Sequence, residues 1–322
     1  MVLLCLSAIA IYLTLIDYIN FNILGLSVKF SLAIFTSLAV LGLSACSTTT
    51  DQSAASYSQA KVLIAKPLPV NPQSELALAR LTEILTKMEI TQEQRAKLFY
   101  DRGVIYDSVG LRGLASFDFQ RALRLQPDLV DAYNFMGIHH TQRQNFVEAY
   151  DAFDSAIELD MNHEYAYLNR GIALYYGKRP QQALADLQRF QLQQQNDPYR
   201  IAWLYLVEYE IDPELAKANL RQHLDGLDHN SWANNILRLF LGDINEQELI
   251  QTVSVGVSDH KQLIDRLCEA YFYLGKYNQL VDRPNTSADY FKLALSTNVY
   301  EFIEHRYAEL ELDLIEAQLS AP

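Results

Sequence analysis

The side chains best suited to chemistry in this sequence are seven histidines and three cysteines. The one grouping that resembles a metal site is the pair His139–His140. Adjacent residues of a helix point about 100° apart, so these two imidazoles do not face a common ion. No H-E-x-x-H pattern occurs, and no cysteine stands at zinc spacing from a histidine. We therefore predict no metal site, with one of the two histidines packed and the other exposed.

Patterns typical of enzymes are equally scarce. The sequence has no G-x-S-x-G, no Walker A pattern and no G-x-G-x-x-G fingerprint. The closely spaced carboxylates Asp151/Asp154 and Glu309/Glu311 have the pattern of ordinary exposed helix charges. A glycosidase would need such a pair across a cleft, which spacing alone does not establish. The sequence therefore predicts a protein without catalytic residues and without a cofactor.

Composition and charge narrow the class of partner. The chain has 322 residues and a formal net charge of -13, which argues against nucleic acid as a partner. Half of the residues are hydrophobic and 20 are tyrosines, whereas glycine and proline together number only 21. This balance favours a helical protein with a large core. Of the cysteines, Cys268 is expected to be a buried small hydrophobe.

The segment KFSLAIFTSLAVLGLSAC, from Lys29 to Cys46, has a basic residue, an apolar run and then small residues. Its last four residues, Leu43 to Cys46, resemble the bacterial lipobox, in which the cysteine thiol is lipidated and the chain is cut before it. We predict that residues 1–45 are a signal peptide and that Cys46 carries lipid. The alternative is an uncleaved membrane helix that contains a cysteine by chance.

The flanks of this segment carry two further expectations. Residues 1–27 contain no Lys or Arg, so the true translation start is expected at Val28. Ser47, in place of an aspartate, is typical of export to the outer membrane. Residues 46–72 are predicted to be the lipidated cysteine and a flexible tether, because residues 47–60 are small and polar. Pro67, Pro69 and Pro72 are expected to stiffen its end.

A recurrence at 34 residues is the strongest pattern in the chain. Gly103, Gly137 and Gly171 repeat at this interval, each preceded by an aromatic residue four positions earlier. Further residues recur in the same phase: Ala115, Ala149 and Ala183; Phe119, Phe153 and Leu187; Ala122, Ala156 and Phe190. The pattern resembles the tetratricopeptide (TPR) repeat, a pair of antiparallel helices whose small residues lie where the helices approach closely.

The predicted fold is therefore an all-α, TPR-like helical-hairpin solenoid over residues 73–322, with a C-terminal capping helix near 300–319. Repeats are expected at about 96–129, 130–163, 164–197 and 268–301. The segment ELALARLTEILTKM should form a helix before the first repeat. Between residues 198 and 267 the repeat consensus is lost, but helical periodicity persists.

A solenoid of this type has a concave groove lined by fixed positions of each first helix. The residues expected there, and offered as partner-binding, are Tyr100, Val104, Asp107, Asn134, Ile138, Thr141, Tyr165, Leu168, Ile172, Tyr175 and Tyr176. The set shifts from polar to aromatic and lacks the basic cluster that clamps a peptide carboxylate. Tyrosine suits interfaces, since a rigid ring supplies area and its hydroxyl a hydrogen bond. The alternative is that these tyrosines pack against the capping helix.

Longer stretches resemble the NlpI lipoprotein family of Gram-negative bacteria. They include LFYDRGVIYDSVGLRGLASFDFQRAL at 98–123, AYDAFDSAIELD at 149–160, LNRGIALYYGKR at 168–179 and FYLGKY at 272–277. The resemblance runs from about residue 62 to 312 and departs from the family in residues 1–27 and 211–262. It implies an outer-membrane lipoprotein that faces the periplasm and forms a homodimer. It also implies an adaptor that binds peptidoglycan endopeptidases and a tail-specific protease, with effects on cell division.

Two other functions remain open from the sequence. Lipidated TPR proteins also serve as assembly factors, either as pilotins or in β-barrel insertion. The other possibility is a cell-wall enzyme, and the missing catalytic motifs argue against it. An adaptor without enzymatic activity is the function that the sequence favours.

Overall fold

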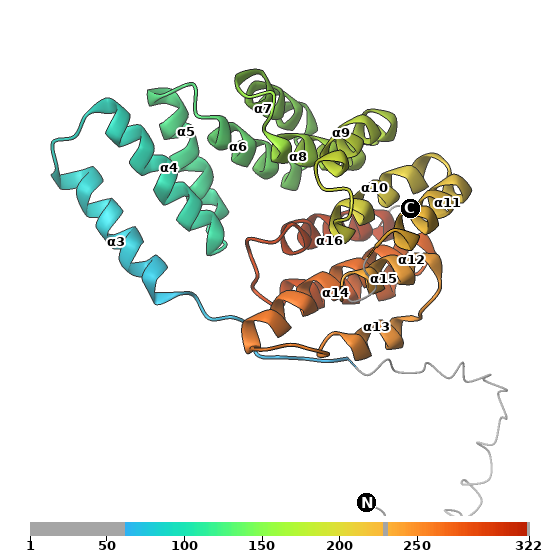
Figure 1. The fold of residues 1–322 in the computed structure, drawn as a ribbon. Helices are drawn as coiled ribbons and strands as arrows, with labels where there is room; N and C mark the ends of the chain where they lie inside the picture. Colours follow the sequence, from blue (N-terminus) through green and yellow to red (C-terminus); the bar gives the residue numbers. More distant parts are fainter. Residues whose placement is uncertain (1–61, 228–230, 321–322) are drawn as a thin grey trace, which may run out of the picture. The chain divides into compact units, whose positions relative to one another are not determined.

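The computed structural model describes residues 62–227 and 231–320, and every regular element in these ranges is a helix (Figure 1). The predicted signal peptide, the start at Val28, Cys46 and the first part of the tether lie outside the described residues. The predicted all-α hairpin fold is confirmed. No helix within the described ranges is long and apolar enough to cross a bilayer.

Three consecutive hairpins match the 34-residue pattern. They are α4 (Gln92–Ser108) with α5 (Arg112–Leu125), α6 (Val130–Gln142) with α7 (Phe146–Leu159), and α8 (Glu164–Tyr176) with α9 (Pro180–Gln193). A Thr91–Gln94 capping box starts the first of them, and Pro180 starts α9 at a position where a missing N–H costs nothing. Neighbouring hairpins pack side by side along the chain, as in a solenoid.

The small residues lie where the two helices of each hairpin come closest. Ala115, Ala149 and Ala183 are fully buried, as are Phe119 and Phe153. A Cβ added at Gly137 would lie 2.5 Å from the Phe153 ring, and one at Gly103 would lie 2.7 Å from Phe119. Since real Cβ atoms do not approach that closely, the recurring glycines are required for helix contact. The predicted physical basis of the repeat is thus confirmed.

The region without consensus is also helical. It forms α10 (Pro198–Ile211), α11 (Pro213–Asp225), α12 (Asn234–Leu241) and α13 (Glu246–Thr252), followed by the hairpin α14 (His260–Leu280) and α15 (Pro284–Leu295). The α14–α15 hairpin repeats the close approach, because a Cβ on Gly275 would lie 2.5 Å from Phe291. Cys268 is buried in α14, as expected.

The last helix, α16 (Ile303–Ser320), closes the array and does not extend it. It packs against α15 and α14 and also against α6 of the second hairpin. Figure 1 shows it between the α6–α10 part of the array and α14. The groove that the repeats would leave open is therefore occupied by the chain's own C-terminal helix.

The N-terminal side of the domain also contacts its C-terminal part. Residues 62–71 run without regular structure, and then α3 (Pro72–Lys87) packs against α4. The backbone N–H of Leu68 donates to the carbonyl of Thr297 at 3.3 Å, and His260 Nε2 donates to the carbonyl of Lys66 at 2.8 Å. These residues were predicted as the end of a flexible tether. The structure instead holds them against the α14–α15 hairpin.

Candidate functional site

The predicted groove residues are mostly inside the array. Eight of them are less than 9% exposed: Asp107, Asn134, Ile138, Thr141, Leu168, Ile172, Tyr175 and Tyr176. Tyr100 and Val104 are half-buried, and Tyr165 is exposed. The expectation that these residues line an open groove is wrong for the eight buried ones, because α16 and the neighbouring hairpins cover them. The binding role of these residues stays a prediction.

Three of the covering contacts come from the last turn of successive first helices. Asp107 of α4 accepts from Arg306 Nη2 at 2.6 Å, and Gln142 of α6 donates to the Arg306 carbonyl at 2.9 Å. Tyr176 of α8 donates to Glu311 Oε1 at 2.7 Å, and its ring centroid lies 5.4 Å from that of Tyr307. For Tyr176, the alternative of packing against the capping helix therefore describes the structure.

The contact between α8, α14 and α16 contains a buried ion pair. Lys276 Nζ lies 2.6 Å from Glu311 Oε1, and both side chains are at most 3% exposed. The Tyr176 hydroxyl donates to the same Glu311 oxygen, and Gln279 Nε2 donates to Glu311 Oε2 at 2.7 Å. Glu311 was predicted as an ordinary exposed charge, which is wrong. The other three carboxylates of that prediction, Asp151, Asp154 and Glu309, are exposed.

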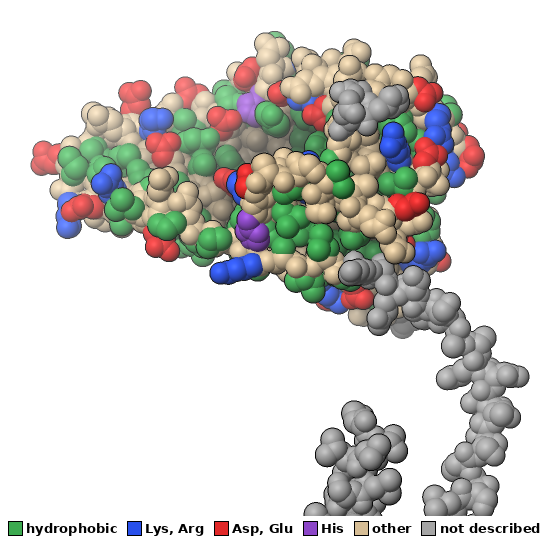
Figure 2. Space-filling view, turned by 60° about the horizontal axis from the view of Figure 1, so that its bottom comes forward, with side chains coloured by type: hydrophobic (Ala, Val, Ile, Leu, Met, Phe, Trp, Pro, Cys, Tyr) green, Lys and Arg blue, Asp and Glu red, His purple; other side chains and the backbone are tan. Residues whose placement is uncertain are grey.

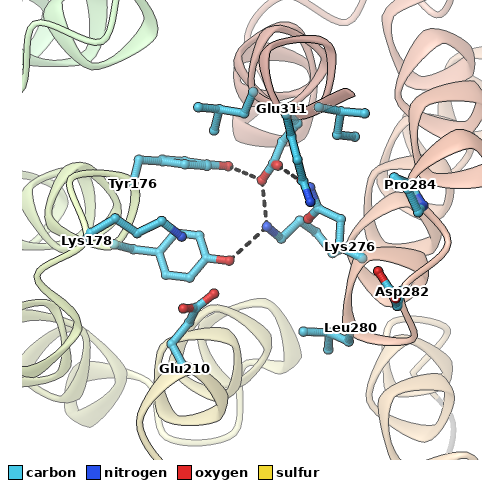
Figure 3. A pocket seen from close by; sticks show the side chains of 13 residues that line it. Tyr176, Lys178, Glu210, Lys276, Leu280, Asp282, Pro284 and Glu311 are labelled. Atoms are coloured by element: carbon cyan, nitrogen blue, oxygen red, sulfur yellow. Dashed lines mark hydrogen bonds and ion pairs between the residues drawn. The ribbon is translucent and has the colours of Figure 1, made fainter. Parts of the chain in front are cut away.

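This ion pair forms the floor of a pocket of about 360 Å³, which we name the Lys276–Glu311 pocket (Figure 3). Its walls come from five helices and the turns between them. The lining residues are Tyr175, Tyr176, Lys178, Glu210, Lys276, Gln279, Leu280, Asp282, Pro284, Glu311, Leu314, Ile315 and Gln318. The volume falls in the range of sites for small ligands or single side chains.

Protonation at the floor follows from burial and pairing. Burial lowers the pKa of Lys276, but the charge of Glu311 and the hydrogen bonds outweigh it, so the pKa lies above its ordinary value. Burial raises the pKa of both Tyr175 and Tyr176. The ammonium is therefore charged and both phenols keep their protons at neutral pH.

Two rim charges are placed by equivalent turns. Lys178 follows α8 with φ 59°, and Asp282 follows α14 with φ 56°. In each turn the next residue's N–H bonds back to the helix, from Arg179 to Leu174 and from Arg283 to Asn278, at 2.8 Å. Such a left-handed turn after a helix satisfies its last carbonyls. The hairpin geometry therefore sets where these two charges stand.

A second polar cluster has the composition of a hydrolase triad. Ser116 Oγ lies 2.7 Å from His139 Nδ1, and His139 Nε2 lies 2.7 Å from Asp107 Oδ1. Burial lowers the pKa of His139, so the neutral imidazole donates to Asp107 and accepts from Ser116. All three residues are at most 5% exposed, and a cavity of about 10 Å³ borders Asp107 on the side of Arg306.

This Ser–His–Asp chain has the character of a structural link. A nucleophile needs access to a substrate and donors for an oxyanion, and Ser116 is only 5% exposed. Arginines lie at both ends instead, with Arg143 donating to Ser116 at 3.2 Å and Arg306 to Asp107. His139 is buried as predicted, whereas its neighbour His140 is half-buried and not exposed as expected. Across the described ranges, no three His, Cys, Asp or Glu side chains are grouped to hold a metal ion.

Sequence reasoning missed Lys276, Gln279, Glu210 and Asp282 as site residues. Lys276 stands one residue after the repeat glycine Gly275, where the first three hairpins have Val104, Ile138 and Ile172. A lysine at an apolar position of the repeat was the signal that could have pointed to a buried ion pair.

No family model matches the chain. Several solved structures are similar to it. YrrB, described as a TPR protein with an unusual peptide-binding site, is 16% identical, with 74% of this chain and 99% of YrrB covered and a TM-score of 0.38. PilF of Pseudomonas aeruginosa is 14% identical, with 76% and 97% covered and a TM-score of 0.37. A tetratricopeptide repeat protein of Parabacteroides merdae is 13% identical, with 76% and 91% covered and a TM-score of 0.44.

Proposed function

We propose that this chain is a non-enzymatic adaptor, anchored to a membrane by lipid on Cys46, whose hairpin domain binds other proteins. The observation that carries the proposal is the stacking of hairpins around α16. This arrangement supplies extended outer faces and a pocket lined by charged and polar side chains. The burial of Ser116, His139 and Asp107 supports a structural role for this cluster over a catalytic one, because each residue is at most 5% exposed.

The outer face of α5 offers a concrete contact surface. Leu111, Leu114 and Phe117 are each nearly half exposed, and Arg121 stacks on the Phe117 ring at 4.3 Å. Aromatic, aliphatic and arginine side chains are those that contribute most to protein interfaces. Figure 2 shows one face of the molecule, on which acidic, basic and apolar side chains are interspersed.

The finer form of the proposal follows the NlpI resemblance. The chain resides in the outer membrane, faces the periplasm and forms a homodimer. It brings peptidoglycan endopeptidases together with a tail-specific protease and thereby controls how much cell-wall hydrolase is present. Tethering on one membrane raises the effective concentration of partners, so contacts of modest affinity suffice.

Crosslinking in intact cells, followed by mass spectrometry of the captured proteins, tests this function. We expect peptidoglycan hydrolases and a protease among the captured proteins, and fewer of both with the double variant Leu114→Ser/Phe117→Ser. Capture of neither class would refute the adaptor. If deletion of the gene lowers the amount of an outer-membrane channel without changing hydrolase turnover, the assembly-factor alternative is correct instead.

The anchor has its own test. Cys46→Ser removes the thiol that would be lipidated, and each acyl CH₂ lost contributes about 0.8 kcal/mol of membrane binding. We expect the variant to leave the membrane fraction and to lose incorporation of labelled palmitate. A wild-type chain without lipid at Cys46 would overturn this part of the proposal.

A further inference from the structure

The Lys276–Glu311 pocket contains hydrogen-bond donors that the chain itself does not use. Lys276 Nζ carries three protons and gives two of them, one to Glu311 at 2.6 Å and one to the Tyr175 oxygen at 2.9 Å. The Tyr175 hydroxyl proton has no acceptor among the described residues. Glu311 is satisfied, with Lys276 and Tyr176 on one oxygen and Gln279 on the other. The floor therefore offers two neighbouring donors to an incoming acceptor, such as a carbonyl oxygen.

The charge balance of the pocket is negative. Two lysines, Lys178 and Lys276, stand against three carboxylates, Glu210, Asp282 and Glu311. Figure 3 shows Glu210 pointing from α10 into the pocket, across from Glu311 on α16. Glu210 and Asp282 are exposed and form no ion pair within the described ranges, so they are available to a ligand cation. The whole chain adds to this bias with its net charge of -13.

One wall of the pocket is apolar. Leu280 and Pro284 line it from the α14–α15 hairpin, and Leu314 and Ile315 line it from α16. A hydrocarbon stem that lies along this wall loses contact with water while its polar end stays at the rim. Lysine and arginine side chains have such a stem and such an end.

From these three features we infer that the Lys276–Glu311 pocket binds a basic segment of a partner protein. A lysine or arginine side chain lies along the apolar wall and reaches Glu210 and Asp282, while a backbone carbonyl accepts from Lys276 and Tyr175. The inference rests on the proposed adaptor function and names the chemistry of one partner contact. The pocket thus differs from a clamp that binds the C-terminal carboxylate of a peptide. A carboxylate that entered this pocket would have to approach three acidic side chains.

The test measures binding of three fluorescent peptides to the purified domain by anisotropy, in about 0.15 M NaCl, where long-range charge effects are screened. The peptides share the sequence Ala-Ala-Leu-X-Leu-Ala-Ala with blocked ends, where X is Arg, Gln or Glu. We expect the Arg peptide to bind at least about tenfold more tightly than the Glu peptide, with the Gln peptide between them. Equal or tighter binding of the Glu peptide overturns the inference.

Variants separate the pocket from the acidic surface as a whole. Glu210→Gln/Asp282→Asn removes two charges at the rim and should weaken the Arg peptide about tenfold or more. Asp151→Asn/Glu158→Gln removes two exposed charges from α7, which does not line the pocket, and should leave its affinity unchanged. Tyr175→Phe keeps the ring and removes one floor donor, so it should weaken binding by about three- to tenfold. If both double variants lose the same affinity for the Arg peptide, the pocket is not the binding site.

The two proposals fail in different ways. If the Glu210→Gln/Asp282→Asn variant still captures hydrolases and protease in cells as the wild type does, the adaptor stands and the basic-segment inference is wrong. If the Arg peptide binds the pocket but no partner is captured, the adaptor function is wrong. Thermal unfolding of each variant confirms that the domain is folded in every comparison.

Discussion

Asp107 and Arg306 stand 199 residues apart in the chain, and their side chains meet at 2.6 Å inside the domain. Burial raises the pKa of Asp107, but its hydrogen bond with His139 and the charge of Arg306 outweigh it, so the pKa lies below its ordinary value. The carboxylate is therefore ionised, nearly fully buried, and neutralised by an arginine on α16. This pair connects the first hairpin to the last helix.

The first prediction concerns this ion pair. Arg306→Met leaves the buried Asp107 carboxylate without its arginine and should lower the free energy of unfolding by about 3 kcal/mol. Arg112→Met removes an arginine whose partner, Glu309, is half exposed, and should cost less than about 1 kcal/mol. Urea unfolding monitored by circular dichroism measures both. Similar losses in the two variants would contradict the role given to Asp107.

The second prediction is a pH dependence that comes from Glu269 of α14. Burial, together with the nearby Glu304 and Asp265, raises its pKa to about 8, against the opposing effects of the Tyr199 hydroxyl and Arg266. The unfolded chain releases this proton near pH 4.5 and the folded chain only near 8. Stability should therefore fall as pH rises through that interval and then level off above about 8.

Glu269→Gln isolates this effect. The amide has the shape of the protonated acid and can accept from Tyr199, which now donates to Glu269 at 2.6 Å. At pH 8 the variant should be more stable than the wild type by on the order of 2–4 kcal/mol, with little difference at pH 4.5. A smaller slope remains, because burial also raises the pKa of Glu304. Glu158→Gln, on the exposed face of α7, is the matched control and should keep the full wild-type slope.

The third prediction tests the close approach of α6 and α7. Gly137→Ala places a methyl group 2.5 Å from the Phe153 ring, which is fully buried. Overpacking of this kind should cost about 1–3 kcal/mol. Gly113→Ala, also inside a helix, meets no atom within 4 Å and should gain up to about 1 kcal/mol from helix propensity. Thermal melting of both variants gives the comparison, and a neutral Gly137→Ala would contradict the packing argument.

The fourth prediction concerns the turn inside each hairpin. Gln144 has φ 60° at the position that Gly110, with φ 79°, occupies in the first hairpin. The left-handed region costs an ordinary residue roughly 1–2 kcal/mol, and glycine avoids this cost. Glycine also gives the unfolded chain more conformational freedom, which offsets part of the gain. Gln144→Gly should therefore stabilise the domain by about 0.5–1 kcal/mol. Gly110→Ala should do the opposite, because its Cβ would also meet the Tyr300 ring. A loss of stability in Gln144→Gly would count against this reading.

The hairpins were predictable because their determinants are local. The spacing of Gly103, Gly137 and Gly171 fixes both the pairing and the phase of the helices. The helices of the region without consensus were found from their amphipathic pattern, which persists where the repeat residues are lost. Each of these signals lies within one or two helices of the contact that it specifies.

The site was largely out of reach of the sequence because its contacts are distant in the chain. The same periodicity that placed Asp107 and Tyr176 on the inner face could not show that α16 occupies that face. Glu311 looked like a surface charge, since nothing near it in the sequence indicates that Lys276, 35 residues earlier, lies beside it. A charged side chain is buried only where it has a partner, and tertiary contacts between distant segments determine that partner.

The docking of α16 also changes how the domain should unfold. In an open row of repeats the outermost hairpins fray first, since each unit interacts only with its neighbours. Here one helix contacts α6, α14 and α15 and bonds to residues of α4 and α8, so it cannot detach without loosening both ends together. Amide hydrogen exchange should thus be nearly as slow in α4 as in α14, and melting should follow a single cooperative transition.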